Sequence, residues 1–288
     1  MTSLPAYAGR RCHNVLNPLH SAVYFSPEYP KELASAGIAD LSESLFIIGR
    51  AAALGRVGPG TIAAAFYNFS YDRIARVVPA VWQSTSPEEV VAARLRAADS
   101  SLRRLLGEQA IASDEMAEAA RLALRATEAC TRHARPLYAA HADLPVPDEP
   151  HLAYWHAATL LREHRGDGHL AVLLDAGLDP VEALVSHTAT GKGMNPQWIL
   201  ATRGWSQQDW DAAADRLRAR GLLDADGEPT EEGTALRKGI ERTTDRLDAA
   251  PYEHLGAAGV ERLTELGTGF LMTAAEAGAF PADLVGKG

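Results

Sequence analysis

The chain has 288 residues, of which 47% are hydrophobic and 23% charged, and its formal net charge at pH 7 is −9. This composition is that of a globular protein with enough apolar mass for one large or two compact units. The acidic balance disfavours a nucleic-acid partner, because phosphate backbones are repelled unless the protein has a local basic face.

The ends and the apolar runs of the chain predict a cytoplasmic protein. The N-terminal stretch MTSLPAYAGRRCHNVLNPLH has no apolar core of signal-peptide length. No apolar run reaches about 18 residues, so we expect no membrane span and no membrane partner. Cys12 and Cys130 fit no paired-cysteine zinc motif, and two reduced cysteines are ordinary in the cytoplasm.

Helical signals dominate from the N-terminal half onward. The stretch Ser86–Leu106 begins with a serine suited to an N-cap, followed by Pro87 and two acids. Ser113–Ala140 predicts a long helix that is interrupted or kinked near Pro136. Leu144–Pro150 has three prolines in seven residues and is the clearest linker.

Segments on the two sides of that linker share an order of signals. Gly58–Val78 aligns with Gly166–Ser186 without a gap, and each has Gly-x-Gly, a helix, a break and another helix. Later helical stretches of the two copies also match each other, in the same order along the chain. We interpret this order as a tandem duplication, near residues 41–140 and 151–249.

The second copy predicts a winged helix-turn-helix. A capped helix runs from Ser206 toward Gly221, a plausible C′ glycine. The stretch LLDADGEPT has an Asp-Gly turn between two short extended pieces, which predicts a β-hairpin, and a new helix starts at Thr230. The wing position of the first copy reads GEQAIAS, which is shorter and degenerate.

Several motifs together resemble a known family. They are LNPLHSAVYFSPE, GRAAALG, AAFYNFS, LLREHRGDGH, RGWSQQDW and TEEG with ERTTD, spread from Leu16 to Leu247. This set is similar to an actinobacterial tandem helix-turn-helix family whose members are labelled as similar to MarR regulators. The resemblance carries no established catalytic residues and no settled function.

We therefore predict a mainly α fold. Two winged helix-turn-helix-like halves would form a pseudo-dimer within the chain, with a short β-wing in the second half. The predicted halves are residues 1–143, with a degenerate wing, and residues 151–288, with a helical tail. Residues 144–150 would link them.

The charge pattern opposes DNA binding by the predicted recognition helix, Ser206–Arg220. Three acids lie toward its N-terminal half, the end that usually meets base edges: Asp209, Asp211 and Asp215. The wing adds three more, Asp224, Asp226 and Glu228, and each of these acids repels a phosphate backbone. The equivalent helix of the first copy is more basic, with Arg94, Arg96, Arg103 and Arg104. We favour a solvated or ion-paired face as the explanation of these arginines over a DNA-binding one.

A polar bend is predicted at Arg162–Gly168, with a helix beginning near His169. The matching stretch of the first copy, ALGRVGPGT, has the glycines but no Glu, His or Asp. The corner can therefore be built without those ionisable groups. A ligand-binding or catalytic role and a wholly structural, ion-paired corner both stay open.

The residues of this bend are chemically competent for catalysis. We predict a catalytic set of His169, Asp167 and Glu163, in which an imidazole acts as general acid or base and a carboxylate orients it. Arg162 would bind a carboxylate or phosphate, with His164 beside it. A metal is disfavoured, because the two histidines are not at the helical spacing of a HExxH site.

Five further residues are predicted to bind a ligand. Arg50 lies in an apolar helix and needs a partner, either an internal carboxylate or an anionic ligand. Tyr67 and Asn68 could line a pocket. His20 and Tyr24 combine polar tips with ring bodies, although a segment that ties the N-terminus to the core explains them too.

These observations favour a small-molecule-binding protein, including the case of a cofactor-independent enzyme of specialised metabolism. The pocket would lie between the two halves, lined by the REHRGDGH bend. The alternative is a ligand-responsive, MarR-like transcription regulator, and a third possibility is a structural interaction protein. We expect no cofactor and no metal, DNA as a disfavoured partner, and a monomer or homodimer.

Overall fold

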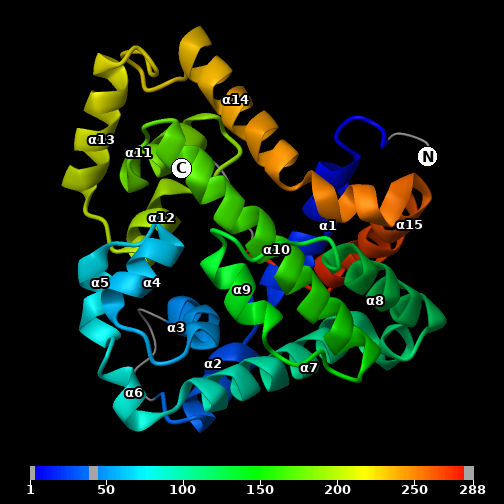
Figure 1. Ribbon diagram of the computed structural model, residues 1–288. Helices are drawn as coiled ribbons and strands as arrows, with labels where there is room; N and C mark the ends of the chain where they lie inside the picture. Colours follow the sequence, from blue (N-terminus) through cyan, green and yellow to red (C-terminus); the bar gives the residue numbers. More distant parts are fainter. Residues whose placement is uncertain (1–3, 39–44, 282–288) are drawn as a thin grey trace. The chain divides into compact units, whose positions relative to one another are not determined.

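The computed structural model describes residues 4–38 and 45–281, and this part of the chain is mainly helical (Figure 1). Its residues form two compact units, each built from several chain segments. Unit 1 comprises Met1–Arg56, Trp82–Gly168 and Asp245–Phe280, and unit 2 comprises Val57–Val81, His169–Thr244 and Pro281–Gly288. The first residue of the predicted duplication, residue 41, and the outer ends of the predicted halves lie outside the described residues.

Unit 1 is a helical assembly in which α1 and α8 pack on α15, and α2 packs on α7. Its elements are α1 (Ala8–Ala22), η1 (Val23–Phe25), α2 (Glu28–Ser35), α3 (Leu45–Ala51), η2 (Ala52–Leu54), α7 (Pro87–Ile111), α8 (Asp114–Thr127), α9 (Pro136–Ala142), α15 (Ala249–Glu276), most of α10 (Pro150–Asp175) and the end of α14 (Glu231–Leu247). The short α6 (Val81–Ser84) lies at the division between the units.

The packing of α1 on α15 follows from the sequence. Cys12, Leu16 and Leu19 recur at helical spacing and are buried. Gly267 of α15 permits the close approach, because a Cβ added there would lie 3.0 Å from a methyl carbon of Val15.

The predicted start of α7 is confirmed. Ser86 accepts a hydrogen bond from the backbone N–H of Glu89, and the Glu89 carboxylate accepts one from the backbone N–H of Ser86. This reciprocal pair satisfies two donors that a helix start leaves without partners. The helix predicted over Ser113–Ala140 is interrupted more widely than expected: α8 ends at Thr127, and α9 begins only at Pro136.

Unit 2 consists of helices around a smaller core of Leu178, Val185, Leu217, Leu223 and Ile240, among others. Its elements are α4 (Pro59–Phe66), α5 (Tyr71–Val77), α11 (Pro180–Ala189), α12 (Pro196–Arg203), α13 (Gln207–Ala219), most of α14 and the end of α10. Helices α11 and α13 pack together, as do α4 and α5.

The predicted ends of α13 are confirmed. Ser206 and Asp209 form a capping box at its start, and Gly221, with φ of 69°, follows its last turn. The next helix, α14, begins after Thr230 as predicted, and the Thr230 hydroxyl accepts a hydrogen bond from the Gly233 N–H.

The predicted β-wing is not built from strands in the described residues. Leu223 and Pro229 form one isolated antiparallel bridge, flanked by the hydrogen bond from Asp224 N–H to Glu228 O. The Asp224 carboxylate accepts the N–H groups of Asp226 and Glu228, and Pro229 has no N–H to donate. These local bonds replace a strand ladder with a tight turn.

The predicted bend at Arg162–Gly168 is wrong, because these residues lie inside the continuous helix α10. Gly166 and Gly168 do not break the helix, since tertiary packing on its buried positions outweighs their low helix propensity. Gly168 has a packing reason instead. A Cβ at this position would lie 2.6 Å from the guanidinium Nη1 of Arg135.

The two compact units do not coincide with the two predicted halves. Residues 144–149 connect α9 to α10 without helix, but they fall inside unit 1. The division instead follows Gly168, within α10. No helix in the described ranges combines the length and the apolar character needed to cross a membrane.

Candidate functional site

Four side chains of α10, each four residues from the next, form a polar stripe in unit 1. Trp155, Thr159, Glu163 and Asp167 therefore share one face of the helix. All four are buried, and Glu163 has no exposed surface. Burying polar groups is costly without partners, so the neighbours of this stripe decide its chemistry.

Glu163 is held by Arg50 of α3. Arg50 donates from Nε to Oε1 over 3.0 Å and from Nη2 to Oε2 over 2.8 Å, and its side chain is 4% exposed. Arg162, at the edge of the unit 1 core, adds a third bond to Oε2 at 2.5 Å. Of the two partners considered for Arg50, the structure shows the internal carboxylate.

His20 joins the stripe through a directed chain of hydrogen bonds. The single hydroxyl hydrogen of Thr159 goes to the Trp155 carbonyl at 2.9 Å, so Thr159 Oγ1 accepts the Nδ1–H of His20 at 3.0 Å. His20 Nε2 then accepts the Tyr24 O–H at 3.3 Å. This tautomer is neutral, in agreement with the pKa of His20, which burial and the nearby Arg94 lower well below its usual value.

Arg94 of α7 completes this arrangement. Its Nη2 and Nε donate to the Tyr24 hydroxyl oxygen at 2.8 and 3.3 Å, and its guanidinium carbon lies 4.5 Å from the centroid of the Trp155 ring. The side chain is buried. The sequence contains a signal for this position: Arg94 is four residues from both Val90 and Ala98, which lie on the buried face of α7.

Two more buried histidines lie in the electrostatic range of Arg94. Burial, followed by the charge of Arg94, lowers the pKa of His141 and of His156 to about 4. His141 Nδ1 lies 2.8 Å from the Leu137 carbonyl, which can only accept, so Nδ1 carries the proton. Its Nε2 is buried and without a hydrogen-bond partner in the described chain.

Asp167 has a structural partner at the start of α9. Its Oδ2 accepts the backbone N–H of Tyr138 at 2.9 Å, so α10 supplies the cap that Arg135, at the N-cap position, does not. Its Oδ1 is buried without a hydrogen-bond partner among the described residues. Burial raises the pKa of Asp167 to about 7, and the charge of Glu163 acts in the same direction.

His164 has a structural partner within unit 1. Its Nδ1 lies 2.9 Å from Oδ1 of Asp248, and both side chains are 2% exposed. Arg165 binds Asp245 at 3.0 Å, and Arg135 donates to the His164 carbonyl. These contacts fix α10 against the junction of α14 and α15.

The other predicted residues lie in unit 2. His169 Nδ1 is 2.9 Å from the Thr244 hydroxyl. The Tyr67 hydroxyl donates to the Leu178 carbonyl at 2.5 Å, and the Asn68 carbonyl accepts from the Trp205 indole. The structure therefore brings Arg162, Glu163 and Arg50 together and His20 and Tyr24 together, while His164 and His169 have separate partners.

Helices α12 and α13 are joined by a short turn of defined geometry. Gly204 has φ of 77° and ψ of 23°, the left-handed conformation that favours glycine. A Cβ there would lie 2.6 Å from both Arg73 Cβ and Ser70 Oγ, so the close packing of α5 and its N-cap residue also requires glycine at position 204. Two helices joined by a glycine-containing turn of about three residues are the helix-turn-helix arrangement.

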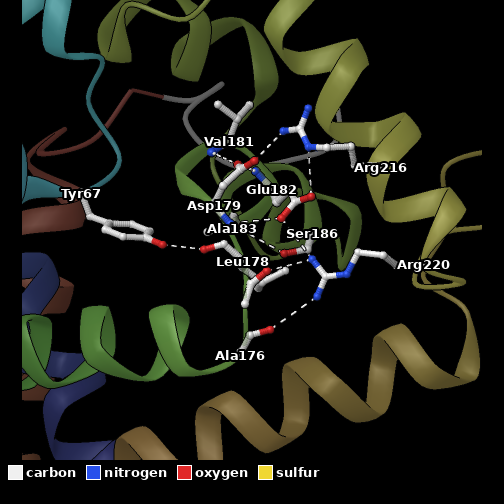
Figure 2. A network of polar contacts seen from close by, with 11 residues as sticks. Tyr67, Ala176, Leu178, Asp179, Val181, Glu182, Ala183, Ser186, Arg216 and Arg220 are labelled. Atoms are coloured by element: carbon white, nitrogen blue, oxygen red, sulfur yellow. Dashed lines mark hydrogen bonds and ion pairs between the residues drawn. The ribbon is translucent and has the colours of Figure 1, made fainter.

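The arginines of α13, and Arg220 directly after it, bind carboxylates and carbonyl groups within unit 2. Figure 2 shows Arg216 and Arg220 converging on the start of α11. Arg216 binds Asp179 at 2.5 Å and Glu182 at 3.1 Å, and Arg220 binds Glu182 at 3.1 Å and the Gly177 carbonyl at 2.9 Å. Asp179 and Glu182 also cap α11, so the same carboxylates shape the helix start.

The other arginines considered for DNA binding, apart from Arg94, are also paired with carboxylates of the chain. Arg218 binds Asp215 at 2.8 Å. On α7, the structure supports the ion-paired alternative for three of the four arginines considered: Arg96 pairs with Glu32, Arg103 with Asp99 and Glu108, and Arg104 with Glu28. A phosphate backbone would have to compete with these carboxylates.

Within the described ranges, no three His, Cys, Asp or Glu side chains are grouped so that they could hold a metal ion. Burial raises the pKa of each thiol, Cys12 and Cys130, to about 12, so neither is a thiolate at neutral pH. Cysteine nucleophilic chemistry therefore has no support here.

The turn between α12 and α13 defines a protein of the helix-turn-helix class. Residues 9–281 match a family described as a helix-turn-helix family, and the chain belongs to that family. No curated protein and no solved structure matches the chain significantly.

Proposed function

We propose that this helix-turn-helix protein binds a small molecule through the polar core of unit 1. The observation that carries the proposal is the buried polar stripe of α10, faced by Arg50, His20 and Arg94. Buried ionisable groups cost stability, and strongly perturbed groups concentrate at functional sites.

An enzymatic form of this function would use Asp167. With a pKa of about 7, this carboxyl group exchanges a proton near neutral pH, as a general acid or base must. Glu163 is held by two guanidinium groups, so it would position other groups and would not itself transfer a proton. His169, bound to Thr244, is the least suited member of the predicted catalytic set.

A thermal-shift screen of chemically diverse small molecules tests the proposal. Binding to the folded state raises the melting temperature in a concentration-dependent way. We expect saturable stabilisation of the wild type and a smaller ligand-induced shift in Thr159→Val, which breaks the hydrogen-bond chain at constant shape. Thr188→Val is the matched control, because Thr188 is a buried, hydrogen-bonded threonine of unit 2. Equal ligand shifts in both variants would place the site elsewhere.

A second candidate function is that of a ligand-responsive transcription regulator. The left-handed Gly204 turn between α12 and α13 and the family membership favour it. The internal pairing of Arg216, Arg218 and Arg220 weighs against it. Selection of bound genomic fragments at physiological salt separates the two candidates, because a regulator enriches a discrete sequence.

We further propose that the chain arose by tandem duplication of a MarR-like winged helix and forms an intrachain pseudo-dimer. Matching capping boxes support this idea: Ser86 pairs with Glu89 at the start of α7, and Ser206 pairs with Asp209 at the start of α13. An experimental structure in which α7 and α13 occupy unrelated positions on superposition of the two halves would refute it.

A further inference from the structure

Arg94 is a buried cation without a carboxylate partner in the described part of the chain. Its side chain is 3% exposed, and both of its hydrogen bonds go to the neutral hydroxyl of Tyr24. The aromatic faces of Trp155 and Tyr24, at 4.5 and 5.8 Å, provide further contacts. Cation–π contacts compensate only part of the cost of burying a charge.

The described residues around Arg94 do not neutralise its charge. Glu163 is a nearby carboxylate, and it already binds Arg50 and Arg162. His20, His141 and His156 are neutral at pH 7, because burial lowers the pKa of each. Two buried guanidinium groups, those of Arg50 and Arg94, and the part-exposed one of Arg162 thus share the Glu163 carboxylate, and this cluster of described residues has an excess of positive charge.

From this juxtaposition we propose that Arg94 binds the carboxylate of a small organic acid. The inference rests on the proposed function and adds its ligand class. In this site Nε and Nη2 of Arg94 donate hydrogen bonds to the Tyr24 hydroxyl oxygen, while Nη1 makes no hydrogen bond to any described residue. A guanidinium presents a planar fork that matches a carboxylate.

The charge balance favours a monocarboxylate over a phosphate. Glu163 balances the buried Arg50, the Arg162 side chain is 28% exposed and screened by solvent, and the three neighbouring histidines are neutral. The surplus among the buried groups is therefore about the one charge of Arg94, which a single carboxylate neutralises. A phosphate near its second ionisation carries about 1.5–2 negative charges and would be left partly unpaired. The buried Nε2 of His141 is an acceptor and would suit a hydroxyl or N–H group on the same ligand.

The test uses full-length protein and four probes: benzoate, acetate, inorganic phosphate and neutral benzamide. Affinities are measured by calorimetry and by thermal shift in the wild type, in Arg94→Gln and in Arg96→Gln. Arg96 is the matched control, because it lies on the same helix and pairs with Glu32 with a side chain that is 53% exposed.

We expect benzoate or acetate to bind saturably to the wild type and to Arg96→Gln, and at least about tenfold more weakly to Arg94→Gln, as for the loss of a charged hydrogen bond. Benzamide and phosphate should bind more weakly than the carboxylates. Carboxylate binding that Arg94→Gln leaves unchanged would overturn the inference. So would preferential binding of phosphate, or of benzamide, although benzamide binding in the core would leave the proposed function intact.

A second measurement needs no ligand. If Arg94 is kept for binding, Arg94→Met should raise the melting temperature of the free protein, since an uncompensated buried charge is removed. If Arg94 is a structural brace, the same variant should melt several degrees lower. That outcome, with no carboxylate binding to the wild type, would refute the ligand class even if the screen finds a neutral ligand.

Discussion

Glu163 illustrates how single residues of this protein bear buried charge. Its carboxylate has no exposed surface and is bound by two nitrogens of Arg50. Such a buried pair adds little net stability compared with apolar residues of the same size. Removing one partner alone is costly, because the other charge is left buried and unpaired. Arg50 and Glu163 are 113 positions apart, so their pairing also ties α3 to α10 within unit 1.

Glu163→Gln should therefore destabilise the protein by about 3–5 kcal/mol, because Arg50 loses its counter-charge. The double variant Arg50→Met with Glu163→Leu should recover much of this loss, since neither charge is left buried. Urea unfolding measures both. Arg96→Gln, which breaks an exposed pair, should have little effect. A Glu163→Gln variant as stable as Arg96→Gln would contradict the burial of this pair.

The titration of Asp167 gives a pH-dependent prediction. Burial raises its pKa to about 7 in the folded protein, against about 3.9 for an unfolded carboxyl group. The folded state binds this proton more tightly, so the contribution to stability is complete below about pH 4 and is lost as pH rises through about 7.

Asp167→Asn cannot titrate but keeps a carbonyl oxygen that accepts the Tyr138 N–H. Relative to wild type, this variant should therefore gain stability as pH rises from about 5 to about 7, by up to about 1.4 kcal/mol for each step of one in pH, and level off above about 8. Melting curves of both proteins across this range measure the difference, and the buried histidines, common to both, cancel. Parallel curves would mean that Asp167 has an ordinary pKa.

At the level of elements, α10 shows what local sequence cannot reveal. Two glycines and a run of charged residues predicted a bend, yet the helix continues through them. The deciding interactions come from distant residues: Arg50 at Glu163, Arg135 against Gly168 and Asp248 at His164. Helix caps, by contrast, depend on residues three apart, and Ser86 and Ser206 were therefore predictable.

The turn between α12 and α13 depends on Gly204. Gly204→Ala would place a side chain in the left-handed region and against Arg73 and Ser70, so we expect a loss of at least about 1–2 kcal/mol. Gly60→Ala is the control in the same unit. Gly60 lies within α4, and a Cβ there meets no heavy atom within 4 Å. The Gly60→Ala substitution should raise the free energy of unfolding by up to about 1 kcal/mol. Equal unfolding midpoints for the two variants would contradict the turn geometry.

At the scale of the whole molecule, composition and periodicity predicted a mainly helical protein, and the family match supports the helix-turn-helix class. The organisation into units was not predictable from local signals, because each unit combines segments far apart in the chain. The candidate site was predictable in part: Arg50, Glu163, His20 and Tyr24 were named. Arg94, by contrast, was grouped with the other arginines of α7 as a basic face for DNA or a solvated or ion-paired face, and the structure buries it.

The net charge of −9 and the internal pairing of the arginines predict poor DNA binding. At physiological salt we expect a dissociation constant in the range of about 10⁻⁶–10⁻⁴ M for any duplex, without sequence preference. Fluorescence anisotropy over a series of salt concentrations measures it. Nanomolar affinity for one operator would promote the regulator function over the one proposed here.

Hydrogen exchange with and without the tightest small molecule from the screen tests the central claim most directly, because it locates the site. Binding in the polar core of unit 1 should slow exchange in α1, α7 and the Pro150–Gly168 part of α10, while α12 and α13 stay unchanged. Protection confined to α12 and α13, with the unit 1 helices unaffected, would contradict the claim.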